Sequence, residues 1–247
     1  MKPAAFEHVA PVETREAFSL LAREGAKPLS GGQSLAPTMN LRLVRPALLV
    51  DVKRLPGLRG YTEQADHLRL GAATTHAEIE DGKVPDVTNG LMPHVAHGIA
   101  YRAVRNRGTI GGSLAHADPA GDWPNVMAAL GATIIALSAQ GERRIPADAF
   151  MTAPFTTALK PGEIILGVEI PRVIGRWGYC KINRKIGEFA KAIGIAIESP
   201  RRLLAGAVDG PPVLLHALDD IPARLDAAHQ HLATVAVQRA IAMMEQT

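Results

Sequence analysis

The sequence predicts an α+β protein, and three observations support this fold class. Helical and strand-like segments are mixed along the 247 residues without the regular alternation of a doubly wound sheet. Short β-branched or apolar runs, such as residues 132–139 and 163–170, predict strands. Signals such as Thr75-x-x-Glu78, a capping box, predict short helices between those strands.

The first unit covers residues 1–53. We expect, in order, a helix over residues 14–23, a strand over 26–29, a helix from Ser34 and a strand over 47–52. Thr14 is expected to cap the first helix and Gly25 to end it. Leu35, Met39 and Leu43 recur at i, i+4 and i+8, which predicts one apolar helix face.

A second unit covers residues 54–172 and a third covers residues 173–247. In the second we expect strands over 67–71, 132–139 and 163–170, with helices from Thr75, over 87–99 and over 118–130. In the third we expect strands over 177–183, 190–197 and 202–208, followed by one or two helices over 223–245.

Two segments with a Gly-Gly pair are the most informative feature for function. They are Ser30-Gly31-Gly32-Gln33-Ser34-Leu35 and Thr109-Ile110-Gly111-Gly112-Ser113. Adjacent glycines reach positive φ, and consecutive N–H groups in such a turn can bind a phosphate. Neither segment matches the G-x-G-x-x-G or the P-loop pattern. One Gly-Gly pair is often an ordinary turn, but two similar segments favour two walls of one diphosphate site.

Composition excludes several classes of function. Cys180 is the only cysteine, so this chain forms no intrachain disulfide, four-cysteine zinc site or iron–sulfur cluster of its own. We expect Cys180 to be a buried structural thiol. The net charge is only +3 and aromatic residues are 4%, which argues against a nucleic-acid groove. We therefore interpret the cluster of Arg102, Arg105 and Arg107 as a solvated or partner-facing basic surface.

No apolar run is long enough for a membrane span or a secretory signal, so a cytoplasmic protein is expected. His94 and His97 could share a helical turn, but no third ligand accompanies them, and no metal site is expected. No convincing acid–base pair stands out either, so no catalytic residue is predicted.

Together these motifs resemble the FAD-binding medium subunits of molybdenum hydroxylases, such as carbon monoxide dehydrogenase and the flavin domain of xanthine dehydrogenase. The matching segments include residues 2–6, 29–42, 49–52, 71–75, 107–113, 118–124, 161–171 and 181–192. The resemblance covers about residues 1–195. It implies a two-subdomain FAD-binding domain of the vanillyl-alcohol-oxidase (PCMH) type, in residues 1–53 and 54–172, and a shortened α+β domain after it.

The resemblance implies that both Gly-Gly segments hold the FAD diphosphate. It also implies FAD contacts for Asp122, for the backbone of Leu166 and for Lys185. From the residues alone, Asp122 fits a helix N-terminal charge equally well, whereas Leu166 would be a core residue and Lys185 a surface charge. Phe189 lies where some relatives place an aromatic residue near the isoalloxazine, although the residues alone favour a core phenylalanine.

Position 33 is Gln, not a histidine that could attach the cofactor, so the resemblance implies noncovalent FAD. It further implies two partners, a small subunit with two [2Fe–2S] clusters and a large molybdopterin subunit, in a dimer of heterotrimers. FAD would then pass electrons from the clusters to an external acceptor. The competing hypotheses are a self-sufficient FAD-dependent oxidoreductase, a scaffold without FAD, and a basic nucleic-acid-binding module.

Overall fold

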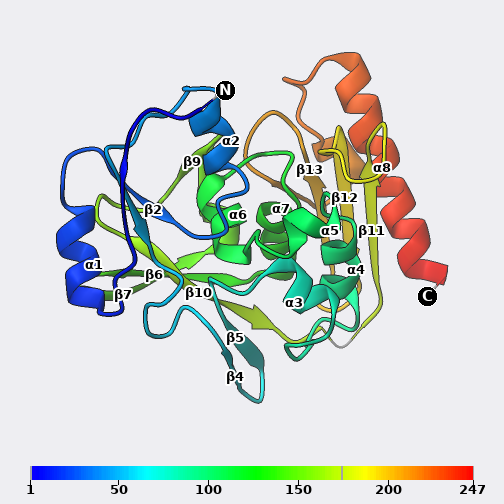
Figure 1. Ribbon diagram of the computed structural model, residues 1–247. Coiled ribbons are helices and arrows are strands. Elements are labelled where there is room, and N and C mark those ends of the chain that lie inside the picture. Colours follow the sequence, from blue (N-terminus) through cyan, green and yellow to red (C-terminus); the bar gives the residue numbers. More distant parts are fainter. Residues whose placement is uncertain (1, 174, 247) are drawn as a thin grey trace.

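Three principal sheets and the helices between them form the framework of the protein (Figure 1). A computed structural model describes residues 2–173 and 175–246. The strands of the three sheets come from residues 7–51, 61–171 and 177–215 in turn, so each sheet uses its own stretch of chain. The α+β fold class is confirmed.

The first sheet is small and parallel, with the order β1 (Glu7–Val9), β3 (Leu48–Asp51), β2 (Ala26–Leu29). Helix α1 (Thr14–Leu21) packs against β2 and β3 and buries Ala17 there. After β2 the chain passes through the first Gly-Gly segment into α2 (Leu35–Asn40). This segment therefore leaves the carboxyl end of a parallel strand, where ligands commonly bind in parallel sheets.

The second sheet is antiparallel, with the order β4 (Tyr61–Glu63), β5 (His67–Gly71), β10 (Ile164–Pro171), β6 (Thr133–Ser138), β7 (Gly141–Pro146). The pair β8 (Met151–Ala153) and β9 (Thr156–Thr157) and the 3-10 turn η1 (Ala147–Ala149) lie between β7 and β10 in the chain. Four short helices follow β5: α3 (His76–Glu80), α4 (Leu91–His97), α5 (Arg102–Arg105) and α6 (Ile110–His116).

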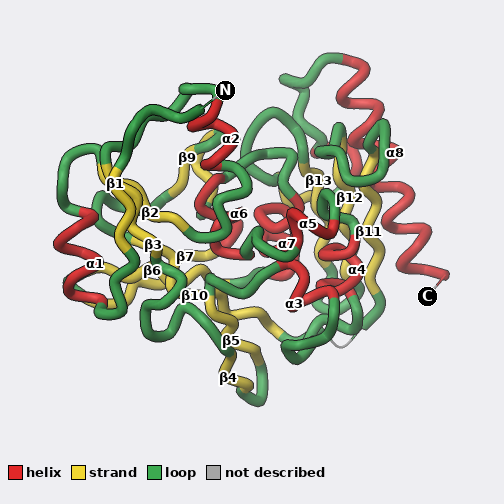
Figure 2. Tube along the Cα trace, in the orientation of Figure 1, coloured by secondary structure: helices red, strands yellow, loops and turns green. Residues whose placement is uncertain are grey.

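Helix α7 (Asp122–Leu130) joins the second and third sheets. All nine of its residues are buried, because it contacts β10 on one side and β12 and β13 on the other. Figure 2 shows α3 to α7 gathered in the centre of the molecule, with strands on both sides of them. This continuous packing fixes the position of Asp122 at the start of α7.

The third sheet has the order β11 (Trp177–Ile182), β12 (Ala192–Ile197), β13 (Arg202–Gly206), β14 (Val213–Leu215), and all its pairs are antiparallel. After the 3-10 turn η2 (Leu218–Asp220), α8 (Ala227–Gln246) covers this sheet. Glycines allow the close contact: a Cβ at Gly178 would lie 1.8 Å from the Ala240 carbonyl oxygen. No helix in residues 2–173 or 175–246 is long and apolar enough to cross a membrane.

Several predicted boundaries are wrong in the first unit. Thr14 is the first residue of α1 and Glu13 precedes it without a side-chain cap, so Thr14 does not cap the helix. Helix α1 ends at Leu21, before the predicted Arg23. Leu43 lies beyond α2 and is 73% exposed, so the apolar face of that helix ends with Met39.

Two helices of the second unit begin later than predicted, because aspartate side chains bind the backbone ahead of them. Asp86 accepts hydrogen bonds from the N–H groups of Thr88 and Gly90, and α4 begins only at Leu91. Asp118 likewise accepts from the Ala120 N–H, and α7 begins at Asp122. Such local bonds compete with helix formation.

Candidate functional site

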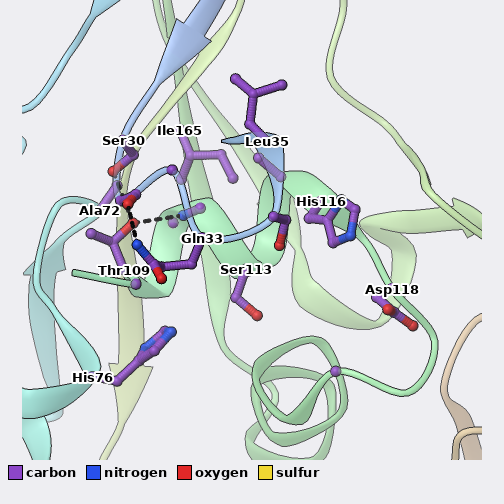
Figure 3. A pocket seen from close by; sticks show the side chains of 18 of the residues that line it. Ser30, Gln33, Leu35, Ala72, His76, Thr109, Ser113, His116, Asp118 and Ile165 are labelled. Atoms are coloured by element: carbon purple, nitrogen blue, oxygen red, sulfur yellow. Dashed lines mark hydrogen bonds between the residues drawn. The ribbon is translucent and has the colours of Figure 1, made fainter. Parts of the chain in front are cut away.

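A cavity of about 690 Å³ lies between the two Gly-Gly segments (Figure 3). All the predicted site residues line it except Ile110, Leu166 and Lys185. Apolar side chains from several elements form much of its remaining wall, among them Val52, Leu58, Val104 and Ile164. The tertiary structure thus brings the two segments to one space, as expected.

The first segment presents a row of free backbone donors. Within the described residues, the N–H groups of Gly31 to Leu35 donate to no protein acceptor. Gly32 has φ +71°, the left-handed conformation that curves such a row into a concave nest. Lys53 supports the segment from behind: its Nζ donates to the Ser30 carbonyl oxygen at 3.3 Å and pairs with Asp51 at 2.9 Å. These donors suit an anionic group.

The second segment is different, because it is the first turn of α6 and not a loop. The N–H groups of Ile110 and Gly111 donate to the carbonyl oxygens of Thr74 and Ala72. The Thr109 side chain caps the helix and accepts from the Gly112 N–H at 3.1 Å. This segment therefore offers hydroxyl groups rather than a second row of free N–H groups.

The two segments are in direct contact. Ser30 Oγ and Thr109 Oγ1 are 2.8 Å apart, and Figure 3 marks this hydrogen bond with a dashed line. A Cβ at Gly31 would lie 2.1 Å from the Arg107 carbonyl oxygen, so only glycine permits this approach. A Cβ at Gly111 would lie 2.5 Å from the Ala72 Cβ. The glycines at 31 and 111 are therefore needed for packing within the protein.

A buried ion pair lies at the N-terminus of α7. Asp122 lines the cavity and accepts from Lys181 Nζ at 2.9 Å; both side chains are at most 10% exposed. Asp122 also accepts from the Tyr179 hydroxyl. Burial, reinforced by the Asp122 carboxylate, raises the pKa of Tyr179 well above its usual value. Lys181 lines the cavity too and was not predicted. The available signal was its position two residues after Tyr179 on one strand, which places both side chains on the same face.

Ile110, Leu166 and Lys185 lie outside the cavity lining. Ile110 and Leu166 are buried in hydrophobic clusters, although Ile164 and Ile165 beside Leu166 reach the cavity. Lys185 is exposed. Phe189 lines the cavity and is 64% exposed, so the alternative of a core phenylalanine is wrong.

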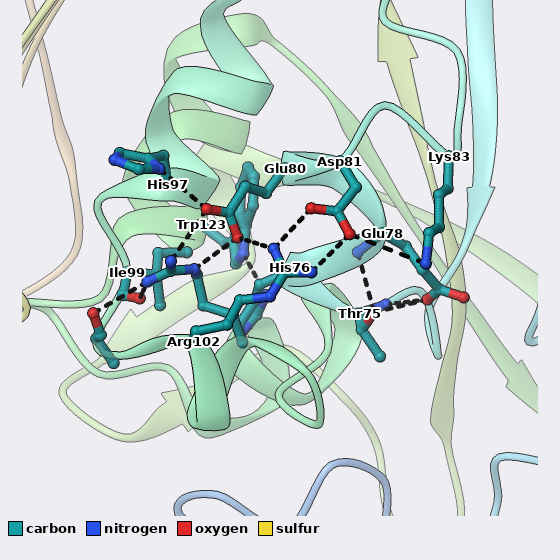
Figure 4. Close-up of polar contacts among 12 residues, drawn as sticks. Thr75, His76, Glu78, Glu80, Asp81, Lys83, His97, Ile99, Arg102 and Trp123 are labelled. Atoms are coloured by element: carbon teal, nitrogen blue, oxygen red, sulfur yellow. Dashed lines mark hydrogen bonds and ion pairs between the residues drawn. The ribbon is translucent and has the colours of Figure 1, made fainter.

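The arginine cluster is divided: Arg102 and Arg107 are exposed, as expected of a solvated or partner-facing surface, whereas Arg105 is buried. Arg105 is 8% exposed, and its guanidinium donates to both carboxylate oxygens of Glu80. Arg102 pairs with Glu80 and Asp81 (Figure 4). Arg105 also donates to the carbonyl oxygens of Ile99 and Ala100, two cavity residues. The network therefore holds part of the cavity wall, which counts against a nucleic-acid surface.

His76, also missed by the sequence reasoning, lines the cavity and is 5% exposed. Trp123 Nε1 donates to its Nδ1 at 2.9 Å. Burial, and secondarily the charge of Arg105, lowers the pKa of His76 to about 4. His76 is therefore neutral at neutral pH.

Two further expectations concern metals and the cysteine. The described residues contain no group of three His, Cys, Asp or Glu side chains that could hold a metal ion. His94 is instead packed against the rings of Trp177 and Tyr179, and His97 pairs with Glu80. Cys180 is half-buried rather than fully buried, and burial raises the pKa of its thiol.

The free N–H groups and the apolar walls of the cavity together fit a long ligand whose central group is negatively charged. A cavity of this volume lies within the range of small-molecule and cofactor sites. The free N–H groups of residues 31–35 suit a diphosphate, and the apolar walls suit flat aromatic rings. The residues present therefore fit FAD.

Comparison with known proteins agrees with this fit. The family described as "FAD binding domain in molybdopterin dehydrogenase" matches residues 4–173. The chain is 40% identical over 194 residues to 6-hydroxypseudooxynicotine dehydrogenase complex subunit alpha of Paenarthrobacter nicotinovorans, covering 77% of this chain and 66% of that protein. It is 37% identical over 196 residues to the carbon monoxide dehydrogenase medium chain of Hydrogenophaga pseudoflava, covering 78% and 68%.

The fold is also similar over its full length to a solved structure. Quinoline 2-oxidoreductase from Pseudomonas putida 86 matches with a TM-score of 0.91 and 31% identity, covering 100% of this chain and 99% of that chain. In the two sequence comparisons, the matched region spans about two thirds of the length of the dehydrogenase complex subunit alpha and of the carbon monoxide dehydrogenase medium chain.

Proposed function

The chain belongs to the family of FAD-binding domains of molybdopterin dehydrogenases, and from this premise we propose that it is the electron-transfer flavoprotein subunit of a molybdenum hydroxylase. The observation that carries the proposal is the row of free N–H groups from Gly31 to Leu35 in a cavity with apolar walls. Bound FAD would take electrons from [2Fe–2S] clusters on a partner and pass them to an external acceptor. The chain itself would bind and orient the cofactor.

Each part of the site has a proposed role. Residues 31–35 would hold the diphosphate, and the hydroxyl groups of Thr109 and Ser113 would face it from the second segment. Asp122 would contact the cofactor while its charge is balanced by Lys181. For Leu166 we keep a backbone contact, since Ile165 next to it lines the cavity.

Lys185 stays a proposed cofactor neighbour, supported by its place beside Gly187 and Glu188, which line the cavity. The absence of histidine at position 33 supports noncovalent binding. We also keep the division into residues 1–53, 54–172 and 173–247, which the separate sheets support.

The proposed partners are a small iron–sulfur subunit and a large molybdopterin subunit, assembled as a dimer of heterotrimers. Relatives named as a complex subunit and as a medium chain support a multi-subunit assembly. A single cysteine, Cys180, supports the placement of the clusters on another chain. We propose the cytoplasm as the location of this complex.

Purification tests the proposal in two steps. The purified chain should be yellow, and denaturation should release FAD rather than FMN; a colourless chain that binds no added FAD would refute it. A complex isolated through a tag on this chain should contain a cysteine-rich small chain and a larger molybdopterin chain. Oxidation of an organic substrate by this chain alone would instead support a self-sufficient flavin oxidoreductase.

A further inference from the structure

His76 occupies a fixed position in the cavity wall. It is the first residue of α3, and the Thr75 side chain caps that helix through the Glu78 N–H at 3.1 Å. The backbone N–H of His76 donates to the Gly108 carbonyl oxygen at 2.9 Å. The imidazole therefore projects from a helix start that is anchored to the segment leading into α6.

Trp123 fixes the tautomer of this imidazole. The indole nitrogen only donates hydrogen bonds, and it lies 2.9 Å from His76 Nδ1. Nδ1 must therefore carry the lone pair. In the neutral ring the proton then resides on Nε2.

The protonated Nε2 has no acceptor in the described part of the chain. Among residues 2–173 and 175–246, the fully enclosed polar side-chain atoms without a partner are Asn125 Oδ1 and Arg202 Nε. His76 Nε2 is not one of them, and His76 lines the cavity. A Cβ at residue 108 would lie 2.7 Å from Nε2, so the imidazole packs closely against Gly108. Figure 3 shows the ring on the cavity wall below Thr109. An N–H donor is thus available to a ligand.

Charge separates the two ends of the site. The five free N–H groups of residues 31–35 are the natural place for the diphosphate. His76 lies on α3, where its imidazole is bonded to Trp123 and is neutral at neutral pH. It therefore offers no charge to a phosphate, whereas an uncharged ring with hydrogen-bond acceptors on its edge fits an uncharged donor. Val104 and Ile99 supply apolar surface for such a ring.

We propose that His76, held in its Nε2–H tautomer by Trp123, donates a hydrogen bond to an acceptor atom in the flavin half of bound FAD. The inference rests on the proposed function, because it requires that FAD occupies this cavity. It makes His76 a binding residue for the flavin, in addition to the predicted site residues.

Binding of two ligands, FAD and ADP, distinguishes a contact with the flavin half of the cofactor from a contact with the adenosine diphosphate half. The full chain is stripped of flavin and titrated with FAD and with ADP, which has the adenosine diphosphate but no flavin. His76→Leu should weaken FAD binding about three- to tenfold, the usual effect of losing one hydrogen bond, and leave ADP binding unchanged. His76→Gln retains an N–H donor and should recover part of the loss. His67→Leu, at a half-buried position outside the cavity, is the control and should change neither.

Each alternative result overturns a different statement. Equal weakening of FAD and ADP would place the donor at the diphosphate, and unchanged FAD binding would remove the contact altogether. Wild-type protein that binds neither ligand would refute the proposed function itself.

Nitrogen-15 NMR of labelled wild-type histidines covers the case in which His76→Leu does not fold. His76 should carry its proton on Nε2 in the free protein, and the Nε2 signal should shift with FAD but not with ADP. A proton on Nδ1, or no response to FAD, would refute the inference.

Discussion

Replacement of Gly32 by alanine tests the row of free N–H groups most directly. Gly32 has φ +71°, and its nearest contact for a Cβ is Leu29 Cδ1 at 3.3 Å, so the substitution strains the backbone without a severe clash. A left-handed alanine costs about 1–2 kcal/mol. The peptides on either side should rotate to relieve this strain, since no protein acceptor holds their N–H groups.

Gly82→Ala is the matched control. Gly82 has φ +65°, a Cβ added there would meet no heavy atom within 4 Å, and the residue does not line the cavity. Both variants should lose similar stability, with each kcal/mol lowering Tm by roughly 2–4 °C. Only Gly32→Ala should weaken FAD binding, by about tenfold to a hundredfold, because one N–H to a charged oxygen contributes about 1.5–3 kcal/mol.

The assays are thermal unfolding without ligand and titration of FAD fluorescence. An FAD dissociation constant for Gly32→Ala within twofold of that for Gly82→Ala would refute the nest as the diphosphate site. Gly111→Val is a poorer test, because its side chain would collide with Ala72 and disturb folding whether or not FAD binds there.

Three more substitutions test the site and its supports. Thr109→Val removes the helix cap and the Ser30 contact; we expect a loss of about 1 kcal/mol in urea unfolding and weaker FAD binding, both largely restored in Thr109→Ser. Arg105→Met removes the buried partner of Glu80, which then keeps only the more exposed Arg102 and His97, and should cost about 1.5–3 kcal/mol in the same assay, with a smaller cost in the double variant that also carries Glu80→Gln. Folding lowers the pKa of His76 to about 4, so the unfolded chain binds more protons between pH 6.5 and 4 and stability should fall as pH falls through this window, by on the order of 3 kcal/mol. His76→Leu should flatten that part of the stability curve; an unchanged slope would contradict the assignment.

Local signals were sufficient where one segment determines its own conformation. The capping box at Thr75 is observed as predicted, because its self-contained pair of hydrogen bonds needs no distant partner. The strands over 26–29 and 67–71 are also observed as predicted, although each pairs with a strand distant in sequence. Boundaries failed at Asp86 and Asp118, where a side chain binds the backbone ahead of a helix. The exposed positions of Leu43 and Phe189 were also decided by packing rather than by residue type.

The sequence by itself determined the α+β class, the two Gly-Gly segments and, through their order with the other motifs, the resemblance to FAD-binding subunits. Only the tertiary structure decided how the two segments differ. Residues 31–35 keep their N–H groups free, whereas those of residues 110–113 are used by α6 and by neighbouring carbonyl groups. It also decided that His76, 47 residues from Trp123 in sequence, is left with a single donor facing the cavity. Hydrogen-bond partners brought together from distant parts of the chain make these distinctions, and no local pattern of residues records them.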